Sequence, residues 1–187
     1  MQSRREQSGK ELLKSNAGVM TAVLAAALVL LPVAGAFAGS GDYGAKGALE
    51  QAGQLDLTLE EMLRYALQDE YLARAEYELI MKEYGTMRPF SNIMSAEERH
   101  IQWVTELYEK YGFEMPADTS ADHVVLPPDL KTAFETGVQA EIDNIAMYES
   151  FLKASDLPDD VREVFEELKR GSENHLRAFR NNLARYK

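Results

Sequence analysis

The stretch Glu97-Glu98-Arg99-His100 decides which fold and which chemistry this sequence predicts. Its first and last residues lie three positions apart, so a helix would place a carboxylate and an imidazole on one face, where both can bind the same metal ion. Apolar and aromatic residues recur at spacings of three or four on both sides of this stretch. The pattern predicts a helix that starts after residue 89 and ends at residue 112.

Three further helices are predicted from the same periodicity. The first begins at Thr58, whose side chain can cap the helix while Glu61 reaches back to it, and it ends at Tyr84. The other two helices cover about residues 128–154 and residues 158–186, and each begins at a proline.

The lengths of the connections predict how these helices are arranged. Short loops join the first helix to the second and the third to the fourth, so each pair should form an antiparallel hairpin. Residues 112–127 are rich in Pro, Asp, Ser and Thr and are long enough to run the length of a helix. We therefore predict an all-α four-helix bundle made of two antiparallel helical hairpins joined by one long crossover.

Carboxylates and histidines lie on the apolar stripes of these predicted helices. On the first helix, Glu70 and Tyr77 are seven residues apart, which is almost two turns. Glu141 and Tyr148 repeat this spacing on the third helix, and His175 lies on the apolar stripe of the fourth. Each hairpin thus carries Glu-x6-Tyr followed by a core histidine, which indicates an internal duplication.

A metal centre would explain why these charged groups face a core. A buried carboxylate without a partner costs several kcal/mol, and a dication can be that partner. The predicted metal ligands are Glu70, Glu97, His100, Glu141 and His175. Oxygen and nitrogen donors without sulfur suit iron or manganese, and zinc is also compatible. Tyr77 and Tyr148 are either ordinary core aromatics or hydrogen-bond donors that orient the ligands, and His123, in the crossover, is interpreted as solvated.

These motifs resemble the ferritin-like superfamily, and in particular its rubrerythrin-type di-iron proteins, in which each half carries E-x6-Y and then E-x-x-H. The resemblance covers about residues 58–186. Residues 70–74 and 172–179 are more narrowly similar to the branch of that superfamily called domain of unknown function 2202. The resemblance implies a ferritin-like bundle around two iron ions, with O2 or peroxide as the oxidant and Glu97 bridging the ions.

Two features depart from the rubrerythrin pattern. Ser172 lies three residues before His175, where that pattern has a fourth carboxylate. We predict that Ser172 lies next to the metal ligands and is not one of them. Glu173 is its neighbour but points about 100° away around the helix. We therefore expect an asymmetric pair of ions, or a site that has lost metal. A rubredoxin-like cysteine module is also absent, so redox chemistry would need an external electron donor.

Residues 1–38 have the features of a signal peptide. Basic residues are followed by a charge-free run from Ala17 to Ala38 that ends in Ala-Phe-Ala. An uncleaved membrane anchor is the alternative, because the run is about 20 residues long. Residues 39–56 are interpreted as a flexible linker without a fold, and residues 57–187 as the ferritin-like domain. The sequence thus predicts export to the periplasm or the extracellular space.

Charge and cysteine content bear on the partners of the protein. The formal net charge is −11, and removal of the predicted leader, with its four basic and two acidic side chains, makes it −13. Nucleic acid and anionic membrane surfaces are therefore not expected as partners. The chain has no cysteine, which excludes disulfides, thiolate metal sites and a cysteine nucleophile. A homodimer is compatible with these features.

Three hypotheses of function follow from the residues and the resemblance. The first is a non-haem di-iron protein that oxidises Fe(II) or reduces peroxide, as a ferroxidase or a peroxidase-type oxidoreductase. The second, suggested by Ser172, is a non-catalytic metal-sensing or partner-binding bundle of the same fold. The third is a purely structural bundle in which Arg74, Arg99 or Arg177 neutralises the core carboxylates.

Overall fold

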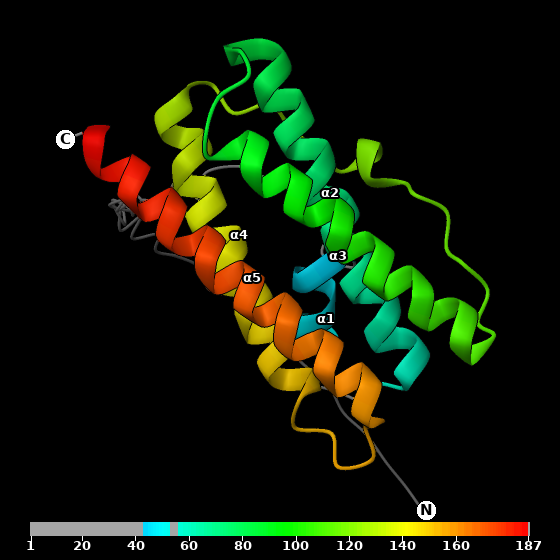
Figure 1. Ribbon diagram of the computed structural model, residues 1–187. Coiled ribbons are helices and arrows are strands. Elements are labelled where there is room, and N and C mark those ends of the chain that lie inside the picture. The colour runs from blue at the N-terminus through cyan, green and yellow to red at the C-terminus, as the bar shows by residue number, and fades with distance from the viewer. Residues whose placement is uncertain (1–42, 53–55, 187) are drawn as a thin grey trace, which may run out of the picture. The chain divides into compact units, whose positions relative to one another are not determined.

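The described part of the protein is entirely helical. The structure is a computed structural model that describes residues 43–52 and 56–186 (Figure 1). These residues form five α-helices and no strand, which confirms the predicted all-α class. The α-helices are α1 (Gly44–Ala52), α2 (Leu59–Tyr84), α3 (Phe90–Tyr111), α4 (Leu130–Phe151) and α5 (Asp159–Leu183). Two short 3-10 helices are η1 (Ser120–Asp122) and η2 (Ala184–Tyr186).

The ends of α2 and α3 lie where the sequence predicts them. At the start of α2 the Thr58 backbone amide donates to Glu61 Oε2 across 2.8 Å, and the Glu61 amide donates back to the Thr58 hydroxyl. This reciprocal cap satisfies two amides that the first turn of a helix leaves without partners. Gly112 ends α3 with a φ of 68°, a left-handed conformation that glycine adopts without strain.

The four long helices pack mainly as two pairs. Helix α2 packs along α3 and α4 packs along α5, while α2 also contacts α4 and α3 contacts α5 (Figure 1). The connection from α3 to α4 is fastened to α2 at two places. Arg74 pairs with Asp118 at 2.6 Å, and the Tyr84 hydroxyl donates to the Pro127 carbonyl oxygen at 2.5 Å.

Two apolar clusters leave room for a polar layer between them. Along α2, for example, Leu67 belongs to one cluster and Tyr77 to the other, and the buried Glu70 lies between them. The same order holds along α5, where Leu168 and Phe179 belong to different clusters and His175 lies between them. The predicted ligands therefore occupy a layer that apolar side chains enclose from both sides.

Helix α1 corrects the prediction that residues 39–56 have no fold. It packs on α2 and α4, and its first amides are held by side chains of α2: Gly44 N donates to Gln68 Oε1 at 3.3 Å and Ala45 N to Asp69 Oδ1 at 2.9 Å. Small residues allow this close approach, since a Cβ on Gly44 would lie 2.9 Å from Asp69 Oδ1. Side chains of α2 cap the first turn of α1 and so stabilise it. The sequence of residues 44–52 alone does not predict this helix, because the capping residues lie in α2.

Residues 1–38, in which a signal peptide or anchor is predicted, fall outside the described residues. Among the helices of the described segments, none is both long enough and apolar enough to cross a lipid bilayer.

Candidate metal centre

Glu97 lies between the two core histidines. Its Oε2 atom is 2.7 Å from His100 Nδ1, and its Oε1 atom is 3.1 Å from His175 Nδ1. All three side chains are buried. The spacing of three residues places His100 beside Glu97 on α3, and the packing of α3 against α5 brings His175 to the other oxygen. One carboxylate therefore reaches two imidazoles.

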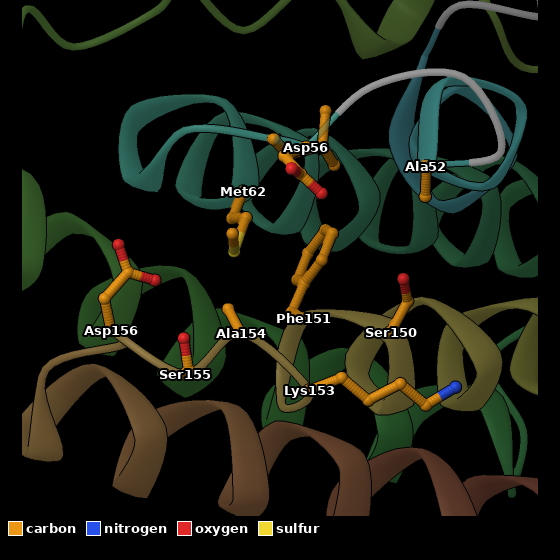
Figure 2. Close-up of a pocket in the computed structure, with 10 residues that line it drawn as sticks. Ala52, Asp56, Met62, Ser150, Phe151, Lys153, Ala154, Ser155 and Asp156 are labelled. Atoms are coloured by element: carbon orange, nitrogen blue, oxygen red, sulfur yellow. The ribbon is translucent and has the colours of Figure 1, made fainter.

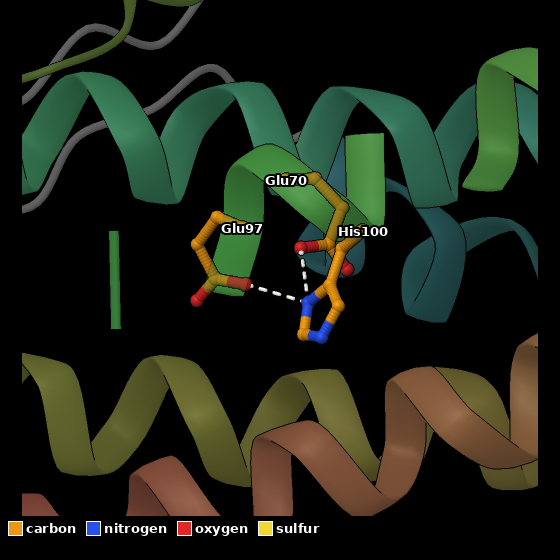
Figure 3. A group of neighbouring side chains, drawn as sticks. All are labelled: Glu70, Glu97 and His100. Carbon is orange, nitrogen blue, oxygen red and sulfur yellow. Dashed lines mark hydrogen bonds and ion pairs between the residues drawn. The ribbon is translucent and has the colours of Figure 1, made fainter. Parts of the chain in front are cut away.

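His100 belongs to the first of two clusters, together with Glu70 and Glu97 (Figure 3). Its Nδ1 atom contacts Glu70 Oε2 at 3.1 Å in addition to Glu97. One donor atom from each of these residues lies within 4.8 Å of the other two. At this spacing the three residues could hold one metal ion together.

The second cluster consists of Glu97, Glu141 and His175 and meets the same spacing. His175 Nδ1 is 3.4 Å from Glu141 Oε1. Helices α2, α3, α4 and α5 thus each contribute at least one side chain. The structure brings all five predicted ligands into these two clusters, and Glu97 is common to both.

Two buried tyrosines contact the glutamates that face them from the other helix pair. The Tyr148 hydroxyl on α4 donates to Glu70 Oε1 on α2 at 2.8 Å. The Tyr77 hydroxyl on α2 donates to Glu141 Oε1 on α4 at 3.4 Å, a longer and weaker contact. These contacts match the interpretation of both tyrosines as donors that orient carboxylates.

Without metal, protonated histidines compensate the negative charge of the buried carboxylates in the clusters. Burial disfavours the charged form of His100, but Glu70 and Glu97 raise its pKa to about 10. Glu141 and Glu97 raise the pKa of His175 to about 10 against the same effect of burial. Burial also disfavours the ionised form of Glu97, yet the two imidazoles lower its pKa to about 2. A cation bound here would take over the charge that these protons supply.

The donor set fits a divalent cation, and one atom supports this directly. Glu141 Oε2 is buried and has no hydrogen-bond partner among the described residues. Burial raises the pKa of Glu141, while His175 and the neighbouring Ser172 hydroxyl act to lower it. A buried oxygen without a donor is costly, and a metal ion would satisfy it.

Helix α5 approaches the clusters with two small residues. Ser172 is buried, with 3% of its surface exposed, and it lies beside Glu141. Gly171 lies against the His100 ring, where an added Cβ would be 2.6 Å from His100 Cε1. The absence of a side chain at this position lets the His100 imidazole pack directly on α5.

The arginines that a purely structural bundle would use do not contact the core carboxylates. Arg74 pairs with Asp118 in the crossover. Arg99 donates to a carbonyl oxygen one turn earlier in α3, and Arg177 donates to a side chain of its own helix. In the described residues, the cluster carboxylates Glu70, Glu97 and Glu141 interact with histidine and tyrosine side chains and with the Ser172 hydroxyl.

Two residues differ from their sequence interpretation. The sequence predicts a solvated His123, but the residue is partly buried and its ring stacks on Tyr43 with centroids 4.0 Å apart. Glu76 of α2 is not among the predicted site residues, yet it is buried, and burial and the charge of Glu141 raise its pKa to about 8. Glu76 lies off the apolar stripe that carries Glu70, so the periodicity of the sequence gave no signal for it.

A hollow of about 500 Å³ lies elsewhere on the protein, at the ends of α1 and α4 and the start of α2 (Figure 2). Asp56, Met62, Phe151 and Lys153 are among the residues that line it. No residue of the two clusters lines this hollow, so it is separate from the metal centre candidate.

Comparison with known proteins assigns the chain to a family. Residues 60–186 match the family described as an uncharacterized protein domain, DUF2202. The chain belongs to the DUF2202 family. All five clustered ligands lie within the matched residues.

One relative of this DUF2202 protein is known from both sequence and structure. This DUF2202 protein is similar to the uncharacterized protein MJ0754 of Methanocaldococcus jannaschii. The two are 30% identical over 134 residues, which span 64% of this chain and 71% of the relative. Its fold is similar to that in the crystal structure of the hypothetical protein MJ0754, with a TM-score of 0.61 and 26% identity over 71% of this chain and 85% of that chain. The likeness supports the arrangement of the helices.

Proposed function

We propose that this protein is an exported ferritin-like four-helix bundle that holds two iron ions and uses them to oxidise Fe(II) or to reduce peroxide. The observation that carries the proposal is the position of Glu97, whose two oxygens contact the Nδ1 atoms of two histidines on different helices. This is the arrangement expected of a carboxylate shared by two ions. Manganese or zinc could be held by the same donors.

The ligands divide between the two clusters. Glu70 and His100 would hold one ion, Glu141 and His175 the other, and Glu97 both. Iron held by such donors would supply redox chemistry: O2 or peroxide would accept the electrons released by Fe(II), and sustained reduction of peroxide would take its electrons from an external donor. The chain contributes the enclosure: apolar clusters on both sides keep the polar layer dry, which strengthens the electrostatic interactions inside it.

The tyrosines and histidines have supporting roles in this proposal. Tyr148 holds the Glu70 carboxylate in one orientation, and such contacts raise the affinity of a metal site. His100 and His175 carry protons at neutral pH without metal, because carboxylates raise the pKa of each to about 10. Metal binding must therefore displace protons from the site.

A second function is favoured by one observation. Ser172 stands where a fourth carboxylate would complete the donor set, so the site is short of one negative ligand. A metal-sensing or partner-binding bundle of the same fold would bind metal without turnover. Rapid oxygen consumption on addition of Fe(II) would exclude this reading.

Metal analysis tests the proposal directly. Protein loaded with Fe(II) and freed of unbound ions should retain two iron ions per chain, one for each cluster. Glu97→Gln should lose both, since both clusters contain this residue. The matched control is Glu98→Gln, which changes the exposed neighbour on α3 and should retain both ions. Less than about one ion per chain in the unaltered protein would contradict the proposal.

Export is proposed from the sequence of residues 1–38 alone. Fractionation of the native cells followed by intact-mass analysis tests it. The protein should be found outside the cytoplasm, with a mass that corresponds to cleavage after Ala38. A protein that retains residues 1–38 in the membrane fraction would instead indicate the anchor.

A further inference from the structure

A row of three aromatic rings connects the surface of the protein to the two clusters. The ring centroids of Trp103 and His100 lie 5.4 Å apart, and those of His100 and His175 lie 5.8 Å apart. Both separations are within the range of about 4.5–7 Å that is typical of contacting rings. Trp103 is partly exposed, whereas both histidines are buried. The row therefore begins at the surface and reaches one predicted ligand of each cluster.

The helices fix the order of these rings. Trp103 follows His100 by three residues on α3, so the two side chains lie on the same side of the helix. The packing of α3 against α5 then brings His175 to the His100 ring. Glu70 and Glu97 both contact His100 at its Nδ1 atom (Figure 3). The carboxylates thus occupy one edge of the imidazole, and aromatic rings contact the remainder.

The centre comes closest to the surface at its histidines. Their side chains are 6% and 10% exposed, against 3–4% for the three cluster carboxylates. Tyr77 and Tyr148 also contact cluster residues, but both are buried. Within residues 43–52 and 56–186, Trp103 is the only partly exposed aromatic side chain whose ring contacts a cluster histidine.

The proposed chemistry needs such a connection. Reduction of one H2O2 to two waters takes two electrons and two protons, and the electrons would leave two Fe(II) ions as Fe(III). An external carrier must then return them across the apolar side chains that enclose the polar layer. The rate of electron transfer falls steeply with the width of the gap that the electron crosses, and contacting π-systems narrow this gap.

We propose that Trp103 is the point at which electrons from an external one-electron carrier enter the protein, and that they pass by way of the His100 ring to the ions. The inference rests on the proposed redox function. Each transfer oxidises the carrier by one electron and reduces one Fe(III) to Fe(II), while no bond forms or breaks at Trp103. Two transfers replace the electrons that one H2O2 removes. The His175 ring extends the path to the second cluster.

Flash-induced electron injection tests the inference. Because the chain has no cysteine, a photoactive ruthenium complex can be attached to a single introduced cysteine. Glu106→Cys places this label on the exposed surface of α3, three residues after Trp103. After a laser flash in the presence of ascorbate, the loss of Fe(III) absorption gives the rate of injection. Trp103→Leu should slow this injection several-fold, and Trp103→Phe, which retains an aromatic ring, should keep most of the rate.

A second label position is the matched control. Ile142→Cys places the complex on α4, where Ile142 is exposed and directly follows Glu141. Injection from this label does not pass through Trp103, so Trp103→Leu should leave its rate unchanged. Calorimetric titration with Zn(II) should give the same affinities for Trp103→Leu and the unaltered protein, which separates the electron path from the integrity of the centre. Trp103→Met, also without a ring, supplies the comparison where the leucine variant does not fold.

The possible outcomes separate the two proposals. Equal injection from the Glu106→Cys label with and without the Trp103 ring overturns the inference and leaves the metal function standing. Slower injection from both labels also overturns it, because the substitution then affects the centre and not one path. A protein that retains no iron, or whose iron is not oxidised by O2 or peroxide, contradicts the proposed function before any flash is applied.

Discussion

The Tyr148 hydroxyl donates to Glu70 Oε1 at 2.8 Å although the two residues lie 78 positions apart in the chain. The equivalent pair, Tyr77 and Glu141, makes the same contact at 3.4 Å. The tyrosine of each Glu-x6-Tyr repeat therefore holds the glutamate of the other repeat. The two repeats are therefore linked by reciprocal tyrosine–glutamate hydrogen bonds between the two helix pairs.

Tyr148→Phe should weaken metal binding at the first cluster. The change removes the hydrogen bond that orients Glu70, and loss of such a contact lowers metal affinity roughly 10- to 100-fold. Calorimetric titration measures the metal affinity of the variant. Tyr108→Phe is the control, because the Tyr108 hydroxyl is also buried but has no partner among the described residues. Equal affinities for the two variants would contradict the role of Tyr148.

Metal binding should quench the fluorescence of Trp103, the single tryptophan of the chain. Its ring centroid lies 5.4 Å from that of His100, close enough for a redox-active ion at the first cluster to quench the excited indole. Titration with Fe(II) under nitrogen should show the loss of emission, and Zn(II) should produce much less. Trp103→Phe gives the background. Emission unchanged by an ion that is bound would place that ion away from His100.

Gly171→Ala should impair the metal centre. The new Cβ would lie 2.6 Å from His100 Cε1, so the imidazole must move away from its carboxylates. We expect about 1–3 kcal/mol of lost stability, typical of overpacking, together with weaker metal binding. Gly137→Ala is the matched control, because its Cβ would meet the Phe179 ring at 2.9 Å instead. This control should lose stability, measured by urea unfolding, and still bind metal.

The candidate ligands could be predicted because helical periodicity depends only on local sequence. Glu70 and Glu141 occupy stripes whose other members are apolar, and His100 follows Glu97 at the spacing of one turn. The pairing of each tyrosine with the other repeat could not be predicted, because it depends on how the helix pairs meet. The position of Ser172 beside Glu141 depends on the same packing.

Helix α1 could not be predicted for a different reason. Its residues are mainly Gly, Ala and Gln, without an apolar period, and it is too short to be stable alone. The groups that cap it, Gln68 and Asp69, lie 24 residues further along the chain. Glu76 was likewise missed because its burial comes from tertiary packing and not from its place on the stripe of Glu70.

Glu76 should make the metal-free protein less stable as the pH rises. Burial, with the charge of Glu141, raises the pKa of Glu76 from 4.5 to about 8 in the folded state. Between these values the unfolded chain releases the proton that the folded chain keeps, so the free energy of unfolding falls as the pH rises from about 4.5 to about 8. The loss contributed by this group is on the order of a few kcal/mol.

Glu76→Gln removes this dependence, because the amide does not ionise. Urea unfolding in the presence of a chelator should show the variant more stable than the unaltered protein at pH 8 and equal to it at pH 4.5. Glu78→Gln changes an exposed glutamate of the same helix and serves as the control. A difference between Glu76→Gln and the unaltered protein that does not vary with pH would contradict the prediction.

The capping of α1 by Gln68 and Asp69 determines how the protein should be shortened for crystallography. A recombinant chain that begins at Leu57, two residues before α2, would remove the amide donor of Asp69, the residue directly before Glu70. It would also remove the Tyr43 ring that covers His123. Truncation ahead of Tyr43 preserves both contacts and keeps the surroundings of Glu70 intact.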